Sequence, residues 1–319
     1  MNLEGLHHVT AVSAAIANNL KFYTEVLGLR LVKKSVNQDD VSAYHLFYAD
    51  KLGSPGTDMT FFDWPHMRPD LPGTDSIAGT AFRVSGRPAL DFWTARFESL
   101  GVKHGDLASF AGRELLPFED PEGQRLYLVN DQHAEFEGEV WSRPDIPDPF
   151  ALRGFFSILL SVPAMEPLDS ILTQILNCST RETATWIDGE TQTAIYATHE
   201  AGGPGSEIWL LVQPGLERAR LGAGGTHHVA FRVADVTAQE AWRERLLQNG
   251  LNVSAVIDRF WFHSIYFRVS PGILFEIATD GPGFAIDEHP ESLGEKLVLP
   301  PFLESRRAEI EAGLLPIEA

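Results

Sequence analysis

The chain has 319 residues, 44% of them hydrophobic and 22% charged, which is enough apolar material for one elaborate domain or two. Its 25 Lys and Arg stand against 44 Asp and Glu, and a formal net charge of −19 disfavours nucleic acid and anionic membrane surfaces as partners. Cys178 is the only cysteine, which excludes an intrachain disulfide and any zinc site built on two or more cysteines. Because no signal-peptide pattern and no apolar run of about 18 residues is found, we expect a cytoplasmic protein without a membrane segment.

In chain order, four segments begin with a glycine and a strand-like apolar run, at residues 5, 79, 154 and 225. Each is followed by a stretch with helical periodicity, at 18–29, 88–102, 167–178 and 238–253. Three of these stretches end in a glycine followed by an apolar residue (Gly28, Gly101 and Gly250), which is typical of a helix C-terminus. Paired strand-like runs with Gly/Pro-rich turns close each repeat. The repeat unit is therefore strand, helix and about three strands, and it needs a second unit to bury its sheet.

Two segments lie outside the repeats. The sequence "WSRPDIPDPF", residues 141–150, is rich in proline and predicts a linker between a first domain at 1–140 and a second at 151–281. The tail at 282–319 is acidic at first and ends in a short helical pattern. This tail could cover a cavity or contact another subunit, but a plain surface helix is the favoured interpretation.

The double histidines of "GLHHVT" and "GTHHVA" occupy the same place in the first and fourth repeats, so that His8 is in register with His228. Side chains alternate along a strand, and only one histidine of each pair can face the enclosed side of a sheet. The last strand of the fourth repeat, "GILFEIATD", adds Glu276, a carboxylate in an apolar run. Burying it is costly unless it is paired or bound to a cation. Two imidazoles and one carboxylate form the set that holds non-haem Fe(II) with open positions for further ligands.

The origin of these three residues also predicts how the repeats pair. Since the candidate ligands come from the first and fourth repeats, we expect these two to lie together and the second and third to pair with each other. In the first repeat the position that matches Glu276 is about Phe62. The second and third repeats have about Leu128 and Leu210 there, so only one repeat supplies the acid.

At these residues the chain resembles the vicinal oxygen chelate superfamily, which includes glyoxalases, bleomycin-resistance proteins and type I extradiol dioxygenases. The resemblance runs from Leu3 to about Phe284 and is carried by "GLHHVTAV", "FYTEVLGLRLVKKSVN", "GTDMTFFDWP", "GTHHVAFRV" and "SIYFRVSPGILFEIATD". Within the superfamily the chain is similar to the ring-cleaving hydroquinone 1,2-dioxygenases, including those acting on chlorohydroquinone and methylhydroquinone. The resemblance implies an α+β fold of four βαβββ modules that pair into two half-open mixed-sheet barrels.

The resemblance also implies a site. The metal, Fe(II) with Mn(II) as an alternative, is expected on His8, His228 and Glu276. Catalytic roles around the metal are expected for five more residues: His7, Thr10, His227, Arg259 and Tyr266.

A chemical role can be named for four of these residues, and a purely structural role is an alternative for Tyr266, Arg259 and Thr10. Tyr266 lies on the strand before Glu276 and can reach the cavity, or it is an ordinary strand aromatic. Arg259 could hold an anionic phenolate, or form a surface ion pair. His7 and His227 could transfer protons, whereas Thr10 is as easily a plain strand residue.

The remaining aromatic residues and histidines are assigned from the sequence pattern alone. Phe62, Phe260, Trp261 and Phe275 are candidates for the wall of the pocket. The alternation of "RFWFHSIYF" puts His263 on the face opposite Tyr266, so it is left out of the site. The remaining histidines share no register and are expected on the surface or in structural roles: His45, His66, His104, His133, His199 and His289.

The predicted function is opening of a hydroquinone ring with O₂ to a muconic semialdehyde-type product by a homo-oligomer, either a dimer or a tetramer. Three alternatives remain. A catechol-type extradiol dioxygenase would use the same ligands. A glyoxalase-like lyase or isomerase normally needs a fourth protein ligand, where this chain has Phe62. A metal-free binding protein of the bleomycin-resistance kind would not need the two histidines and the glutamate.

Overall fold

Four copies of one strand–helix–three-strand unit build the protein, and the computed structural model describes residues 1–317. The first unit comprises β1 (Leu6–Ser13), α1 (Ile16–Lys21), β2 (Arg30–Val36), β3 (Tyr44–Ala49) and β4 (Asp58–Asp63). The second comprises β5 (Ser76–Val84), α2 (Arg87–Leu100), β6 (Ala108–Phe110), β7 (Arg113–Glu119) and β8 (Arg125–Asn130). The third comprises β9 (Phe155–Val162), α3 (Leu168–Ser170), β10 (Ser179–Thr185), β11 (Gln192–Ala197) and β12 (Glu207–Val212). The fourth comprises β13 (Thr226–Val233), α4 (Val236–Gln248), β14 (Ile257–Asp258), β15 (His263–Ser270) and β16 (Ile273–Thr279).

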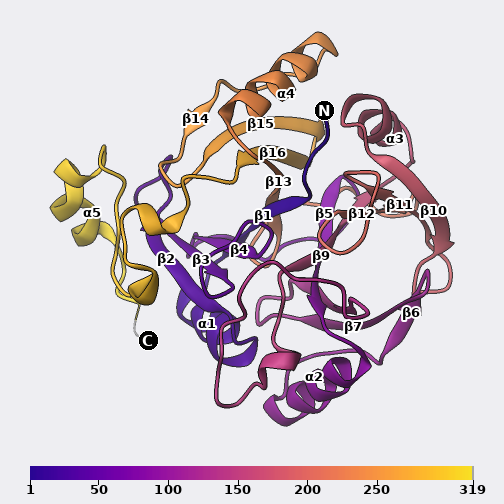
Figure 1. The fold of residues 1–319 in the computed structure, drawn as a ribbon, viewed down its shortest axis with the longest axis horizontal. Coiled ribbons are helices and arrows are strands. Elements are labelled where there is room, and N and C mark those ends of the chain that lie inside the picture. The colour runs from indigo at the N-terminus through magenta and orange to yellow at the C-terminus, as the bar shows by residue number, and fades with distance from the viewer. Residues whose placement is uncertain (318–319) are drawn as a thin grey trace.

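The units combine into two eight-stranded mixed sheets (Figure 1). One has the strand order β14-β15-β16-β13-β1-β4-β3-β2, and the other β10-β11-β12-β9-β5-β8-β7-β6. In the first sheet the units meet where β1 pairs antiparallel with β13, and in the second where β5 pairs antiparallel with β9. The first and fourth units therefore share one curled sheet and the second and third share the other. The predicted α+β class with two half-open barrels is confirmed.

The strands alternate between the core and the inside of a half-barrel. In β1, Leu6, Val9 and Ala11 join the main hydrophobic core, whereas His8 and Thr10 face the other side. Helices α2, α3 and α4 lie at the periphery in Figure 1, whereas β1, β13, β5 and β9 lie toward the centre. Tryptophans anchor two of these helices to the core, because Trp93 of α2 and Trp242 of α4 have no exposed surface.

The two half-barrels differ in what fills them. Large aromatic side chains of the second sheet pack on one another, and the rings of Trp186 and Trp209 lie 5.7 Å apart with Phe110 against both. The first half-barrel instead carries the histidines on the corresponding face. The inner face of the first half-barrel thus offers polar groups where that of the second is filled by aromatic side chains.

The helical stretches differ in length from their predictions. The predicted helix at 88–102 is α2, and it ends as expected at Gly101, which has a φ of 67°. The stretches at 18–29 and 167–178 contain only short α-helices, each continued by a π-helical turn, at Phe22–Val26 and Ile171–Ile175. A wider turn fits one more residue between the same two strands, and hydrophobic periodicity alone does not distinguish it from an α-helix.

The segment at 141–150 lies between β8 and β9 and contains an isolated bridge between Arg143 and Ile146 and a 3₁₀ turn, Asp148–Phe150. The division into domains at 1–140 and 151–281 stays a prediction. The tail from residue 282 runs past β2 to α5 (Arg307–Gly313), at the left edge of Figure 1. Its Phe284 and Leu293 pack with Val32 and Phe47, so the first part of the tail closes one side of the half-barrel. Within residues 1–317, no helix has the length and apolar character to cross a membrane.

Candidate metal centre

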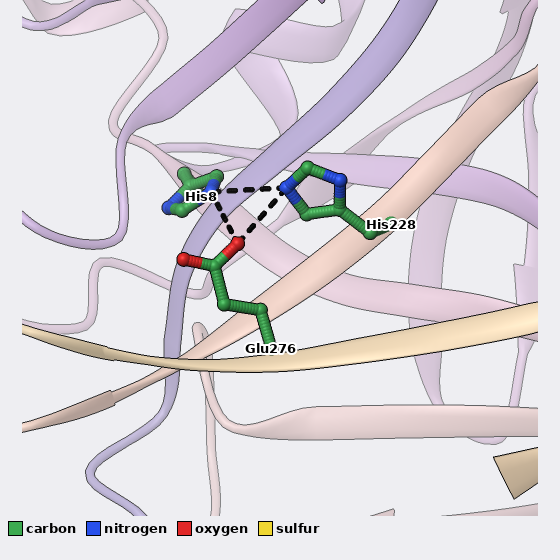
Figure 2. Close-up of side chains that lie close together, drawn as sticks. All are labelled: His8, His228 and Glu276. Atoms are coloured by element: carbon green, nitrogen blue, oxygen red, sulfur yellow. Dashed lines mark hydrogen bonds and ion pairs between the residues drawn. The ribbon is translucent and has the colours of Figure 1, made fainter. Parts of the chain in front are cut away.

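Three buried side chains from neighbouring strands converge on one point inside the first half-barrel (Figure 2). His8 Nε2 lies 3.3 Å from His228 Nε2, and Glu276 Oε2 lies 3.2 Å from the former and 3.0 Å from the latter. Strand register brings them together, because Ala230 pairs with His8 on one side and with Glu276 on the other. His228 in turn pairs with Thr10, two residues beyond His8.

The donor atoms have the properties expected of ligands to a divalent cation. Glu276 Oε1 accepts a hydrogen bond from Ser264 Oγ at 2.5 Å, but Oε2 is buried and makes no hydrogen bond within the described residues. Burial by itself would raise the pKa of Glu276, yet His8 and His228 hold this pKa well below its usual value. Atoms that share one ion at about 2.1 Å and about a right angle lie about 3.0 Å apart, near the observed spacings. The three residues therefore fit a metal held on one face, with the opposite face free for other ligands.

A second histidine stands behind each of the two metal-facing histidines. His7 Nδ1 lies 2.9 Å from His8 Nδ1, and His7 Nε2 lies 3.1 Å from the carbonyl oxygen of Thr279. A carbonyl only accepts, so His7 carries its proton on Nε2 and accepts at Nδ1, and His8 donates from Nδ1. This leaves the lone pair of His8 Nε2 directed at the centre. His227 Nδ1 lies 2.8 Å from His228 Nδ1, which repeats half of the arrangement.

These outer histidines are neutral. Burial, followed by the neighbouring His8, lowers the pKa of His7 to about 3. Burial and the adjacent His228 likewise lower the pKa of His227 to about 3. A neutral imidazole can accept a hydrogen bond from the N–H of its neighbour, whereas an imidazolium can only donate.

A cavity of about 390 Å³, part of it open to solvent, adjoins the three side chains. One wall comes from the first unit, the other from the fourth, and a loop after β2 forms the rim. The lining residues are His8, Asn37, Gln38, Asp39, His45, Phe47, Phe62, His228, Arg259, Trp261, Phe262 and Tyr266.

Arg259 and Tyr266 both line this cavity. Tyr266 pairs with Glu276 across the hairpin, and its ring lies 5.7 Å from that of His228. Arg259 Cζ lies 5.5 Å from the Tyr266 ring, and the guanidinium also makes two hydrogen bonds to Asp39, at 2.8 and 3.2 Å. The two interpretations of Arg259 are thus combined, since one side chain faces the cavity and forms an ion pair at its rim.

The other candidates lie around this centre or away from it. Thr10 is fully buried and its Oγ1 lies 2.8 Å from Thr60 Oγ1, so it does not line the cavity. Of the aromatic candidates, Phe62 and Trp261 line the cavity, whereas Phe275 lies in the main core and Phe260 is outside the lining. His263 is also outside the lining.

His45 is a lining residue that sequence reasoning missed, since we expected it on the surface or in a structural role. Burial is the main cause that lowers its pKa well below the ordinary value, so it is neutral. The repeat contained the signal for it. His45 pairs with Phe62 as Tyr266 pairs with Glu276, and Phe62 is the counterpart of Glu276 in the first repeat. Extending the alignment by one strand makes His45 the counterpart of Tyr266.

Comparisons with known proteins identify the family of the chain. Residues 5–128 match the family model of the Glyoxalase/Bleomycin resistance protein/Dioxygenase superfamily. MhqA of Bacillus subtilis (strain 168), named as a ring-cleaving dioxygenase, is 44% identical over 320 residues, which cover 100% of each chain. The Chlorohydroquinone/hydroquinone 1,2-dioxygenase of Sphingobium indicum is 31% identical, with 97% of this chain and 95% of that protein covered.

Solved structures support the same relationship. A crystal structure from Bacillus subtilis subsp. subtilis str. 168, described as that of a dioxygenase, superposes with a TM-score of 0.90 at 36% identity, covering 99% of this chain and 98% of that one. Glyoxalase I from Zea mays shares the fold alone, with a TM-score of 0.63 at 16% identity and 86% and 92% of the two chains covered. The chain belongs to the glyoxalase/bleomycin resistance protein/dioxygenase superfamily and, within it, to the ring-cleaving dioxygenases.

Proposed function

We propose that the protein is an Fe(II)-dependent dioxygenase that opens the ring of a hydroquinone with O₂ and releases a muconic semialdehyde-type product. The convergence of His8, His228 and Glu276 on one point beside a cavity lined largely by aromatic side chains carries this proposal. The relative from Sphingobium indicum, which is named for hydroquinone, supports the choice of substrate.

The metal would be held by the two Nε2 atoms and Glu276 Oε2, and it would supply a site where the substrate and O₂ meet and exchange electrons. The chain itself binds and orients the ring. Phe47, Phe62 and Trp261 offer apolar surface to its faces and edges. Arg259, held by Asp39, places a fixed positive charge beside the cavity, which favours an ionised hydroxyl and the carboxylate that forms when the ring opens.

Tyr266 is placed to hold or deliver a proton. Burial, followed by Glu276, raises the pKa of Tyr266 above its ordinary value, so the phenol keeps its proton at neutral pH and can donate a hydrogen bond to a substrate oxygen. His7 and His227 were predicted to move protons. In the structure both ring nitrogens of His7 make hydrogen bonds, which supports a role in orienting the His8 ring rather than in moving protons.

A catechol-type dioxygenase would use the same three ligands and remains the main alternative. Phe62 stands where a glyoxalase-like enzyme would place a fourth ligand, and this favours the dioxygenase. A cytoplasmic location, the dimeric or tetrameric state and Mn(II) as an alternative metal stay predictions.

Oxygen consumption by metal-loaded protein tests the proposal. Protein reconstituted with Fe(II) without air is mixed with hydroquinone or catechol, and O₂ uptake is followed together with the ultraviolet spectrum of the product. We expect uptake with hydroquinone and one O₂ consumed per ring opened. Faster uptake with catechol would assign the alternative, and uptake with neither ring would contradict both.

A further inference from the structure

The metal-side cavity has two walls related by the internal repeat, and each offers a polar ring at the same position. Tyr266 is on the wall from the fourth unit and pairs with Glu276, and His45 is on the wall from the first unit and pairs with Phe62. Only one of these pairs includes a candidate ligand. His45 therefore faces the same cavity as the metal centre without any place in the metal site itself.

Hydrogen bonds and stacking fix the His45 ring. Its Nε2 lies 2.9 Å from Thr60 Oγ1, and this hydroxyl lies 2.8 Å from Thr10 Oγ1. Its ring centroid lies 4.0 Å from that of Phe47 and 4.5 Å from that of Phe62. The chain of two hydroxyls is closed off by burial, because Thr10 and Thr60 have no exposed surface.

The other nitrogen of this ring is free within the described residues. His45 Nδ1 makes no hydrogen bond there, and the side chain is only half-buried although it lies inside the half-barrel. Its exposed part faces the cavity that it lines. A neutral imidazole with one nitrogen held by a hydroxyl presents one donor or one acceptor at the other nitrogen.

His45 is flanked by apolar side chains on its wall, and the polar residues Asn37, Gln38 and Asp39 of the first unit belong to the rim loop after β2. Phe47 and Phe62, the neighbours that line the cavity beside it, are apolar. On the opposite wall, Arg259 is engaged by Asp39 and by the Tyr266 ring. A ring with hydroxyls at opposite ends, one of them on the metal, needs a second polar contact away from the metal, whereas adjacent hydroxyls can both reach the metal.

We propose that His45 binds the hydroxyl of the substrate that is not on the metal, through Nδ1, and thereby selects rings with para hydroxyls over rings with one hydroxyl. Thr10 and Thr60 act through His45 as positioning residues, since they hold its Nε2. This inference rests on the proposed function, because it takes the ring to be a hydroquinone.

Binding without turnover tests the contact. Calorimetric titrations of the metal-loaded protein without O₂ give the affinities for hydroquinone and for phenol, which lacks the second hydroxyl. We expect wild-type protein to favour hydroquinone about tenfold, the worth of one hydrogen bond in a buried site. His45→Phe should remove this preference while phenol affinity changes less than about twofold. Thr60→Val should reduce the preference, and His45→Gln should keep part of it.

His263→Phe is the matched control, because His263 is a half-buried strand histidine outside the cavity lining, and it should keep the full preference. Metal content, measured on each variant, should stay at the wild-type level, since His45 is not among the ligand atoms. A His45→Phe protein that still favours hydroquinone, or that loses affinity for both ligands equally, overturns the inference. Wild-type protein that shows the preference but takes up no O₂ contradicts the proposed function and leaves the His45 contact supported.

Discussion

His7 and His8 are bonded to each other through their Nδ1 atoms, 2.9 Å apart, while the Nε2 of His7 is held by the carbonyl of Thr279 at 3.1 Å. The carbonyl fixes the proton of His7, and His7 in turn fixes the proton of His8 on the nitrogen that points away from the metal centre. The 2.8 Å contact between His227 and His228 is the counterpart in the fourth unit. Each double histidine therefore consists of one residue that lies beside Glu276 and one that is hydrogen-bonded behind it.

Replacing the orienting histidine should weaken metal binding without removing a ligand. We expect His7→Phe to lower the affinity for Fe(II) or Mn(II) about 10- to 100-fold, because His8 loses the acceptor that sets its tautomer and ring orientation. Competition with a chromophoric chelator measures this. His227→Phe should act in the same direction, and His263→Phe should leave the affinity unchanged. An unaltered affinity in His7→Phe would show that the pairing has no part in metal binding.

Glu276→Gln should abolish most of the gain in thermal stability that the protein shows when a metal ion is added. In the wild-type protein, adding Mn(II) at about 100 times its Kd should stabilise the fold by about 2.7 kcal/mol, and a chelator should reverse the gain. The variant keeps the shape of the side chain but loses its charge, so the shift in Tm should largely disappear. Thermal unfolding with and without metal measures the difference. Equal shifts in both proteins would place the metal elsewhere.

Much of this arrangement could be predicted from the sequence because the repeat carries it. The register of His8 with His228, and of Glu276 with Phe62, depends only on the alignment of units, and it led to three side chains that converge in space. The role of His45 was missed because it has no histidine partner in another unit. It becomes visible only when the strand pairing is known, since β3 pairs with β4 as β15 pairs with β16.

Contacts made by the tail could not be predicted, because nothing local marks their partners. In "LVKKSV", Lys33 and Lys34 look alike, yet Lys33 has no exposed surface and its ammonium pairs with Asp287 and Glu288, more than 250 residues away. The tail was expected to be a surface helix, and α5 is one, but the segment before it supplies these carboxylates. Asp287 also accepts a hydrogen bond from Trp261 Nε1 at 3.0 Å, which links the tail to the wall of the cavity.

Lys33→Met should therefore loosen the tail and destabilise the protein. Removing the ammonium leaves two poorly exposed carboxylates facing each other, and breaking a buried ion pair in this way costs about 3–5 kcal/mol. Urea unfolding measures the loss, and limited proteolysis should show earlier cleavage within residues 282–317. Lys34→Met is the matched control, because Lys34 forms no ion pair within the described residues, and it should cost less than about 1 kcal/mol. Similar losses in the two variants would mean that the Lys33 cluster does not hold the tail.

Asp120 should make the contact between the two half-barrels sensitive to pH. It follows β7 and accepts hydrogen bonds at 2.9 Å from the backbone N–H groups of Glu122 and Gln124, and at 3.4 Å from the hydroxyl of Tyr23 in the first unit. Burial raises the pKa of Asp120 to about 6, against 3.8 for the ordinary group. A carboxyl with a raised pKa binds its proton more tightly in the folded protein. Its contribution to stability is then greatest at low pH and is lost as the pH rises through about 6.

We therefore expect the free energy of unfolding to depend differently on pH in the wild-type protein and in Asp120→Asn. Between pH 5.5 and 7.5 the wild-type protein should lose about 0.8 kcal/mol of unfolding free energy that the variant does not lose, from the linkage of a single group with this shift. Urea unfolding at both pH values measures it, and only the difference between the two pH values matters, because the amide also changes the backbone hydrogen bonds at either pH. Asp188→Asn is a suitable control, since Asp188 lies in an exposed turn where hydrogen bonds from Thr191 outweigh burial and lower its pKa below 3.8. Parallel pH dependence in wild-type and Asp120→Asn proteins would show that Asp120 is already ionised throughout this range in the folded state.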